Sequence, residues 1–113
     1  MDCIFCNIIR QEIPAKIHYE DEHLIIIDDI SPKAPIHRLL IPKQHIPTLN
    51  ALNTETYPLM GKLYEQAVHI AHSLNISEEG YRLIMNCNPH GGQTVYHIHL
   101  HLMGGRFFTW PPG

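Results

Sequence analysis

The chain has 113 residues, of which 44% are apolar and 17% are charged, and its formal net charge is −3. This composition supports one hydrophobic core and excludes a disordered chain, while the slight negative charge gives no general attraction to nucleic acid. We therefore expect one domain over residues 1–113. The unusual feature is the presence of ten histidines, because histidine alone has an unperturbed side-chain pKa near neutrality.

The first predicted element is a short helix over residues 4–9, where apolar side chains recur at helical spacing. No basic segment followed by a long apolar run precedes it, and the longest apolar stretch, residues 24–27, is far shorter than the ~20 residues of a membrane span. We therefore expect a cytoplasmic protein. In that reducing compartment Cys3-x-x-Cys6 is either half of a metal site or a pair of free thiols.

Three strands are predicted next, over residues 16–20, 23–29 and 37–42. The second is the strongest of them, since a β-branched run ends there at a segment rich in turn-forming residues. The connections between these strands are short, which favours antiparallel pairing.

A long helix is predicted over residues 55–74, with Asn53 or Thr54 as its cap and Pro58 in its first turn. Two more strands are predicted over residues 81–87 and 95–103. The pattern is that of an α+β fold, an antiparallel sheet of four or five strands with the long and the short helix on one of its faces.

The last predicted strand contains three alternating histidines, in the segment YHIHLHL. Side chains of a strand alternate between its two faces, so His97, His99 and His101 project together, while the intervening aliphatic side chains pack under the long helix. The preceding residues 90–94, HGGQT, offer backbone and side-chain donors for an oxyanion. A histidine pair on a strand can also bind zinc. Because the strand has no neighbouring acid, we favour phosphoryl chemistry without a catalytic metal.

At these motifs the chain resembles the histidine triad (HIT) family, and within it the Hint branch of purine nucleoside phosphoramidate hydrolases. The stretches that carry the resemblance are, in order, CIFCNII, EIPAKI, DDISPKAPIH, LIPKQHI, the long helix, GYRLIMN, GGQTVYHIHLH and GGRFFTWPPG. The resemblance implies a HIT-like five-stranded sheet joined to that of a second copy across a homodimer. It also implies hydrolysis of the P–N bond of substrates such as adenosine 5′-monophosphoramidate, with no cofactor required for catalysis. From the net charge and the short apolar stretches we expect neither nucleic acid nor membrane as a partner.

The resemblance assigns roles to individual residues. His99 corresponds to the nucleophile, which attacks phosphorus, expels the amine and carries the nucleotide until water releases it. The other catalytic residues implied are His37, Thr94, His97 and His101. The nucleotide-binding residues implied are His99, His101, Gly92, Gln93 and Thr94 for the phosphate, Asn86 at its edge, Asp29 for the ribose, Ile4, Phe5, Ile8, Ile13, Ile27, Ile30 and Leu39 for the base, and Trp110 reaching the partner's site. Taken alone, Asp29 also fits a turn-forming role.

Some family members join an N-terminal CxxC pair to two histidines in a structural zinc site, and Cys3, Cys6, His45 and His97 match those positions. Two thiolates and two imidazoles form a closed tetrahedral set. Buried free thiols are the alternative. Two other functions remain open: a non-enzymatic purine nucleotide-binding or scaffold protein, and a zinc-dependent hydrolase.

Overall fold

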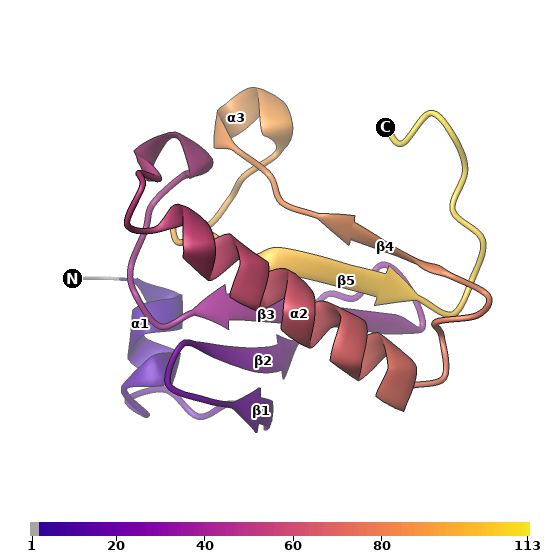
Figure 1. Ribbon diagram of the computed structural model, residues 1–113, viewed down its shortest axis with the longest axis horizontal. Helices are drawn as coiled ribbons and strands as arrows, with labels where there is room; N and C mark the ends of the chain where they lie inside the picture. The colour runs from indigo at the N-terminus through magenta and orange to yellow at the C-terminus, as the bar shows by residue number, and fades with distance from the viewer. Residues whose placement is uncertain (1–2) are drawn as a thin grey trace.

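The protein is built on a five-stranded antiparallel sheet (Figure 1). The computed structural model describes residues 3–113. Its strands are β1 (Ile17–Glu20), β2 (Leu24–Asp28), β3 (Ile36–Pro42), β4 (Tyr81–Ile84) and β5 (Leu100–Gly104). They lie in the order β1-β2-β3-β5-β4, so the last strand of the chain is inserted between β3 and β4. The expected fold class, an α+β fold with this number of strands, is confirmed.

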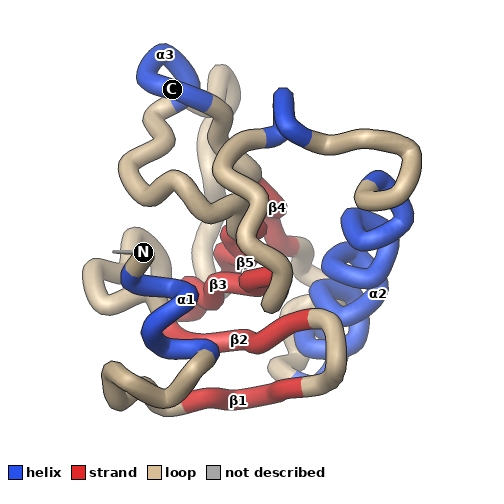
Figure 2. Tube along the Cα trace, turned by 90° about the vertical axis from the view of Figure 1, so that its left-hand side faces the viewer, coloured by secondary structure: helices blue, strands red, loops and turns tan. Residues whose placement is uncertain are grey.

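The two principal helices cover opposite faces of the sheet, as Figure 2 shows. They are α1 (Ile4–Ile9) and α2 (Tyr57–Ser73), and two short turns complete the elements, η1 (Leu49–Ala51) and α3 (Asn88–Gly91). The expectation that both helices share one face is therefore wrong. Its physical reason lies in β2, whose first four residues are all buried, so that both faces of this strand need a cover.

Two hydrophobic clusters fill the space on either side of the sheet. The cluster under α2 contains Leu24, Ile26, Leu40, Leu63, Ala67, Ala71, Ile76, Leu100 and Leu102. The cluster under α1 contains Cys3, Phe5, Cys6, Ile8, Ile25, Ile27, Leu39 and Ile41. Neighbouring residues of β2 thus belong to different clusters, as the period of two in a strand requires.

The short helix lies where it was predicted, and the long one begins two residues late. Thr56 is the residue that precedes α2, and Asn53 instead forms the turn before it, accepting the N–H groups of Glu55 and Thr56 with its side-chain oxygen. The predicted cap at Asn53 or Thr54 is therefore one turn too early. Pro58 lies in the first turn, as predicted, where its missing N–H costs no hydrogen bond.

The two C-terminal strands are shorter than predicted. β4 ends at Ile84, and β5 begins only at Leu100, so that His97 and His99 precede the ladder. Pairing with β3 stops at Leu40 opposite Leu100. Two residues beyond Leu40 stands Pro42, which has no N–H to donate and whose carbonyl accepts a hydrogen bond from the His97 ring. The β3–β5 ladder thus ends just before His97 and His99, while β3 remains paired with β2 as far as Pro42.

No helix within residues 3–113 has the length and apolar character needed to cross a bilayer.

The packing of α2 on the sheet predicts a large effect of Leu63→Ala. Leu63 is fully buried in the cluster under α2, so the cavity left by the substitution should lower the free energy of unfolding by about 2–5 kcal/mol in chemical denaturation. His69→Ala on the exposed side of the same helix is the control, with an expected change within about 0.5 kcal/mol. Equal effects of the two substitutions would contradict the described packing.

Candidate active site

A cavity of about 310 Å³ opens between α1, the end of β2 and the segment that leads into β5. Its lining combines two kinds of side chain. The apolar residues are Ile4, Phe5, Ile8, Ile27, Ile30, Leu39 and Val95, and the polar ones or glycine are Asp28, Asp29, Asn86, Gly92, Thr94, His99 and His101. An apolar wall with a few convergent polar groups is the usual form of a small-molecule site.

His99 is held in one tautomer by a backbone hydrogen bond. Its Nδ1 lies 2.8 Å from the carbonyl oxygen of His97, which can only accept, so Nδ1 carries the hydrogen and Nε2 keeps its lone pair. Burial lowers the pKa of His99 and outweighs the opposing effect of that hydrogen bond. The ring of Phe5 contacts it edge-on, with centroids 5.1 Å apart. A neutral imidazole with a free lone pair is a nucleophile at neutral pH.

His101 is held in the other tautomer through a relay. The backbone N–H of Lys33 donates to Nδ1 of His37 over 3.0 Å, so the hydrogen of a neutral His37 is on Nε2, 2.9 Å from Nδ1 of His101. His101 therefore accepts at Nδ1 and carries its own hydrogen at Nε2. Burial, and then the neighbouring histidines, lower its pKa to about 4. At neutral pH this ring is an uncharged donor that faces the cavity.

The same relay affects whether Asp29, His37 and His101 can bind a catalytic metal. Ligand atoms of Asp29, His37 and His101 lie within 4.8 Å of one another. However, the Lys33 N–H occupies Nδ1 of His37 and so places its hydrogen on Nε2, the atom nearest the other two groups. A protonated ring nitrogen cannot ligate a metal. The geometry favours a hydrogen-bond relay at this position.

Asp29 forms the turn considered from the sequence and also lies at the cavity. One carboxylate oxygen accepts the backbone N–H of Ser31 at 2.8 Å, as in an Asx turn, and the other lies 3.4 Å from Nε2 of His37. The residue also lines the cavity, next to the apolar wall. Gly92 has φ +83° as the left-handed cap of α3, a conformation that strains any other residue.

Gln93 was expected to bind the nucleotide, but its side chain is occupied elsewhere. Its oxygen accepts the N–H of Asn88, and its nitrogen donates to the carbonyls of Pro47 and Val95. The residue is buried and does not line the cavity. In this structure the Gln93 side chain therefore holds the loop in place.

Four other residues predicted for catalysis or nucleotide binding lie outside the cavity lining. Ile13 packs against the cluster under α1, and His97 is fully buried behind the cavity. Trp110 is 82% exposed and borders a separate cavity of about 690 Å³ that meets the first at His101 and Asn86. His37 is buried and borders the same separate cavity as Trp110.

Two lining residues were missed by the sequence reasoning. Val95 precedes His97 by two residues, so the alternation of an extended chain places it on the same face as the histidines. Asp28 also borders the cavity, although its carboxylate is engaged by Arg38 at 2.9 Å and lies 3.0 Å from His18. No sequence signal distinguishes this acid from Asp29.

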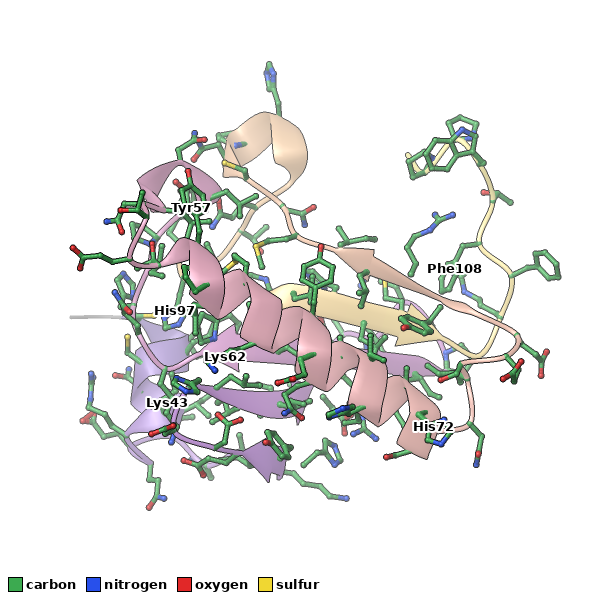
Figure 3. The ribbon with its side chains drawn as sticks, viewed as in Figure 1. Lys43, Tyr57, Lys62, His72, His97 and Phe108 are labelled. Carbon is green, nitrogen blue, oxygen red and sulfur yellow. The ribbon has the colours of Figure 1, made fainter. Side chains whose placement is uncertain are left out.

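His97 instead belongs to a buried cluster with Cys3, Cys6 and His45, at the α1 end of the sheet (Figure 3). Its Nδ1 lies 3.3 and 3.6 Å from the two sulfurs and 3.2 Å from Nδ1 of His45, which is 3.4 Å from the sulfur of Cys6. Tetrahedral zinc with its usual bond lengths separates such ligands by about 3.3–3.8 Å. The Nε2–H of His97 donates to Pro42 over 2.7 Å, which leaves Nδ1 free to ligate. The donor set fits zinc.

The chain matches a family model, known relatives and solved structures. The family model described as "scavenger mRNA decapping enzyme C-term binding" matches residues 2–109. The purine nucleoside phosphoramidase of Escherichia coli K12 is 51% identical over 105 residues, covering 93% of this chain and 88% of the relative.

Two solved structures superpose along most of their length. A HIT family hydrolase from Legionella pneumophila has a TM-score of 0.96 and 49% identity, covering 99% of this chain and 100% of its own. A zinc-bound histidine triad protein from Mycobacterium smegmatis has a TM-score of 0.80 and 35% identity, covering 94% of this chain and 76% of its own.

The buried relay predicts an unusual titration of His101. In the folded protein the midpoint should lie near pH 4, against about 6.5 for the unfolded chain. Between these values the unfolded chain binds the extra proton, so this residue lowers stability as pH falls from about 6.5 to 4 and has no effect above that window. NMR titration of the imidazole, in buffer and in concentrated urea, measures both midpoints. A folded-state midpoint near 6.5 would contradict the relay.

Proposed function

This chain belongs to the histidine triad family, and we propose that it hydrolyses the P–N bond of purine nucleoside 5′-phosphoramidates such as adenosine 5′-monophosphoramidate. The observation that carries the proposal is the neutral His99 ring, whose Nδ1 is bound to a carbonyl and whose Nε2 is left with a lone pair beside the cavity. The purine nucleoside phosphoramidase relative from Escherichia coli supports the same activity.

We propose one orientation of the nucleotide in the cavity. The purine packs against the apolar wall, where Phe5 and Leu39 are buried and Ile30 is fully exposed at the rim. The carboxylate of Asp29 accepts hydrogen bonds from the ribose hydroxyls. The phosphate then lies at the polar residues of the lining, among them Thr94 and His101.

Catalysis proceeds in two displacements at phosphorus. Nε2 of His99 forms a bond to phosphorus while the bond to the amine nitrogen breaks, and the amine departs with one proton taken from solvent. Water then attacks phosphorus and breaks the phosphorus–histidine bond, which releases the nucleoside monophosphate, returns one proton to solvent and restores the neutral ring. Because burial keeps the His99 ring neutral, the first step needs no prior deprotonation.

The other groups stabilise charge on the phosphate oxygens. The Nε2–H of His101 donates to one of them, and its orientation is set in advance by His37 and the Lys33 amide. A donor that is already oriented in a buried site needs no reorganisation in the transition state. We assign to the hydroxyl of Thr94, which lines the cavity, a contact with the leaving amine.

We also propose zinc at Cys3, Cys6, His45 and His97. Four protein ligands leave no open position, so the ion supplies structural cross-linking. The proposed reaction uses no cofactor.

We propose a homodimer that forms along β4, the edge strand at the end of the sheet opposite β1. On α2, Lys62 lies on the flank toward the β1–β2 turn, because it lines a cavity with residues of that turn. Tyr64 is about 200° further round the helix and therefore lies on the opposite flank, toward β4. Tyr57 and Val68 are also at least half exposed. An open strand edge beside an apolar stripe favours pairing with a second copy, which then brings Trp110 within reach of its partner's cavity.

The proposed dimer predicts a solution mass twice that of one chain by light scattering. Tyr64→Glu places a charge in the apolar stripe and should shift the protein toward the monomer. Lys62→Glu, on the opposite flank of α2, is the matched control and should remain dimeric. A monomeric native protein would refute the dimer.

The proposed nucleophile predicts the effect of His99→Ala. Hydrolysis of adenosine 5′-monophosphoramidate should fall by on the order of 10³-fold or more, because no other group can form the covalent intermediate. His72→Ala changes an exposed histidine near the far end of α2 (Figure 3) and should leave the rate unchanged. Mass spectrometry of the quenched native enzyme should find a nucleotide on the segment with the triad. Activity that survives His99→Ala would remove the proposed nucleophile, and nucleotide binding without turnover would favour the non-enzymatic alternative.

A further inference from the structure

The cysteine–histidine cluster and the nucleotide cavity share two parts of the chain, helix α1 and the segment from His97 to His99. We propose that metal occupancy of the cluster formed by Cys3, Cys6, His45 and His97 sets the affinity of the adjacent cavity for purine nucleotides. The proposal rests on the proposed function in one respect, namely that the nucleotide binds in this cavity.

The first connection runs through α1. Its six residues begin directly after Cys3, whose sulfur accepts the N–H of Cys6 at 3.4 Å, so both thiols of the cluster lie in its first turn. The side chains of Ile4, Phe5 and Ile8 on the same helix form part of the cavity wall. A helix of this length is not stable by itself. Its position therefore depends on its contacts with the rest of the protein, and the cluster is one of them.

The second connection runs through His97. Its ring contributes Nδ1 to the cluster, and its backbone carbonyl accepts the hydrogen bond from Nδ1 of His99. Phe5 contacts both rings, with centroids 5.8 Å from His97 and 5.1 Å from His99. A shift of the cluster is thus transmitted both to the apolar wall and to the ring that faces the phosphate.

A bound metal changes how firmly these parts are held. The four donor atoms already lie within 4.8 Å of one another, but without an ion they are joined only by contacts of 3.2–3.6 Å that involve sulfur or a pair of ring nitrogens. Such hydrogen bonds are weak, and zinc replaces them with four direct bonds.

Hydrophobic packing should keep α1 folded on the sheet when the metal is removed. Phe5 and Ile8 are buried against β2 and β3. The hydrophobic cluster under α2 contains no residue of α1. We therefore expect the metal-free protein to remain folded with a loosened cavity wall. Nucleotide and zinc then bind cooperatively, and the coupling must be reciprocal.

The test is calorimetric titration of AMP into protein carrying one zinc per chain by elemental analysis, and into the same protein stripped of metal. AMP affinity should fall at least tenfold on removal of zinc, within the range of about 5–150-fold that couplings commonly span. Cys6→Ser should lose zinc and AMP affinity together. Cys87→Ser, at the third free thiol and outside the cluster, is the matched control and should keep both. Saturating AMP should strengthen zinc binding by the same factor.

Hydrogen exchange separates a local effect from simple unfolding. In the metal-free protein the amides of Asn7 and Arg10, which bond to Cys3 and Cys6, should lose protection while those of α2 keep theirs. Equal AMP affinity with and without zinc would overturn the proposal, as would loss of protection throughout the chain or failure to bind zinc. Failure of zinc-loaded protein to bind AMP would instead refute the proposed function.

Discussion

The hydrogen bond between Nδ1 of His99 and the carbonyl of His97 is the interaction on which the proposed chemistry depends. Imidazole has two nitrogens that exchange roles freely in water, and only the one without a hydrogen can attack phosphorus. A backbone carbonyl two residues earlier removes that freedom, because it accepts from Nδ1 and leaves the lone pair on Nε2. Burial acts in the same direction, since it disfavours the charged ring in which both nitrogens are blocked.

The end of the sheet supplies the geometry for this bond. A carbonyl within a regular antiparallel ladder is usually occupied by the neighbouring strand. β5 begins only at Leu100, where its pairing with β3 ends opposite Leu40. The His97 carbonyl consequently remains available to the His99 ring. Ile98 is still anchored, since its N–H donates to Ile46 at 2.8 Å. The segment keeps the alternation of a strand without its pairing.

Much of this arrangement could be predicted from the sequence, because alternation and helical spacing are local properties. The histidine parity, the short helix at residues 4–9 and the long helix all follow from them. The side of the sheet on which α1 lies could not be predicted from local patterns, because it depends on the burial of both faces of β2. The role of Gln93 was also out of reach, because its partners Pro47 and Asn88 meet it only in the folded chain. Sequence patterns indicate which residue types gather, and tertiary hydrogen bonds decide what each of them can do.

The three alternating histidines illustrate that distinction. The ring of His97 donates from Nε2 to a carbonyl and turns Nδ1 toward two thiols, while His99 donates from Nδ1 and presents Nε2. His101 accepts at Nδ1 from His37 and so offers an Nε2 hydrogen. In the function we propose, one residue type at a spacing of two thus supplies a ligand, a nucleophile and a donor. The difference arises from the partner of each ring. A substitution of His37, which holds the His101 ring from outside the cavity lining, is therefore expected to alter the site.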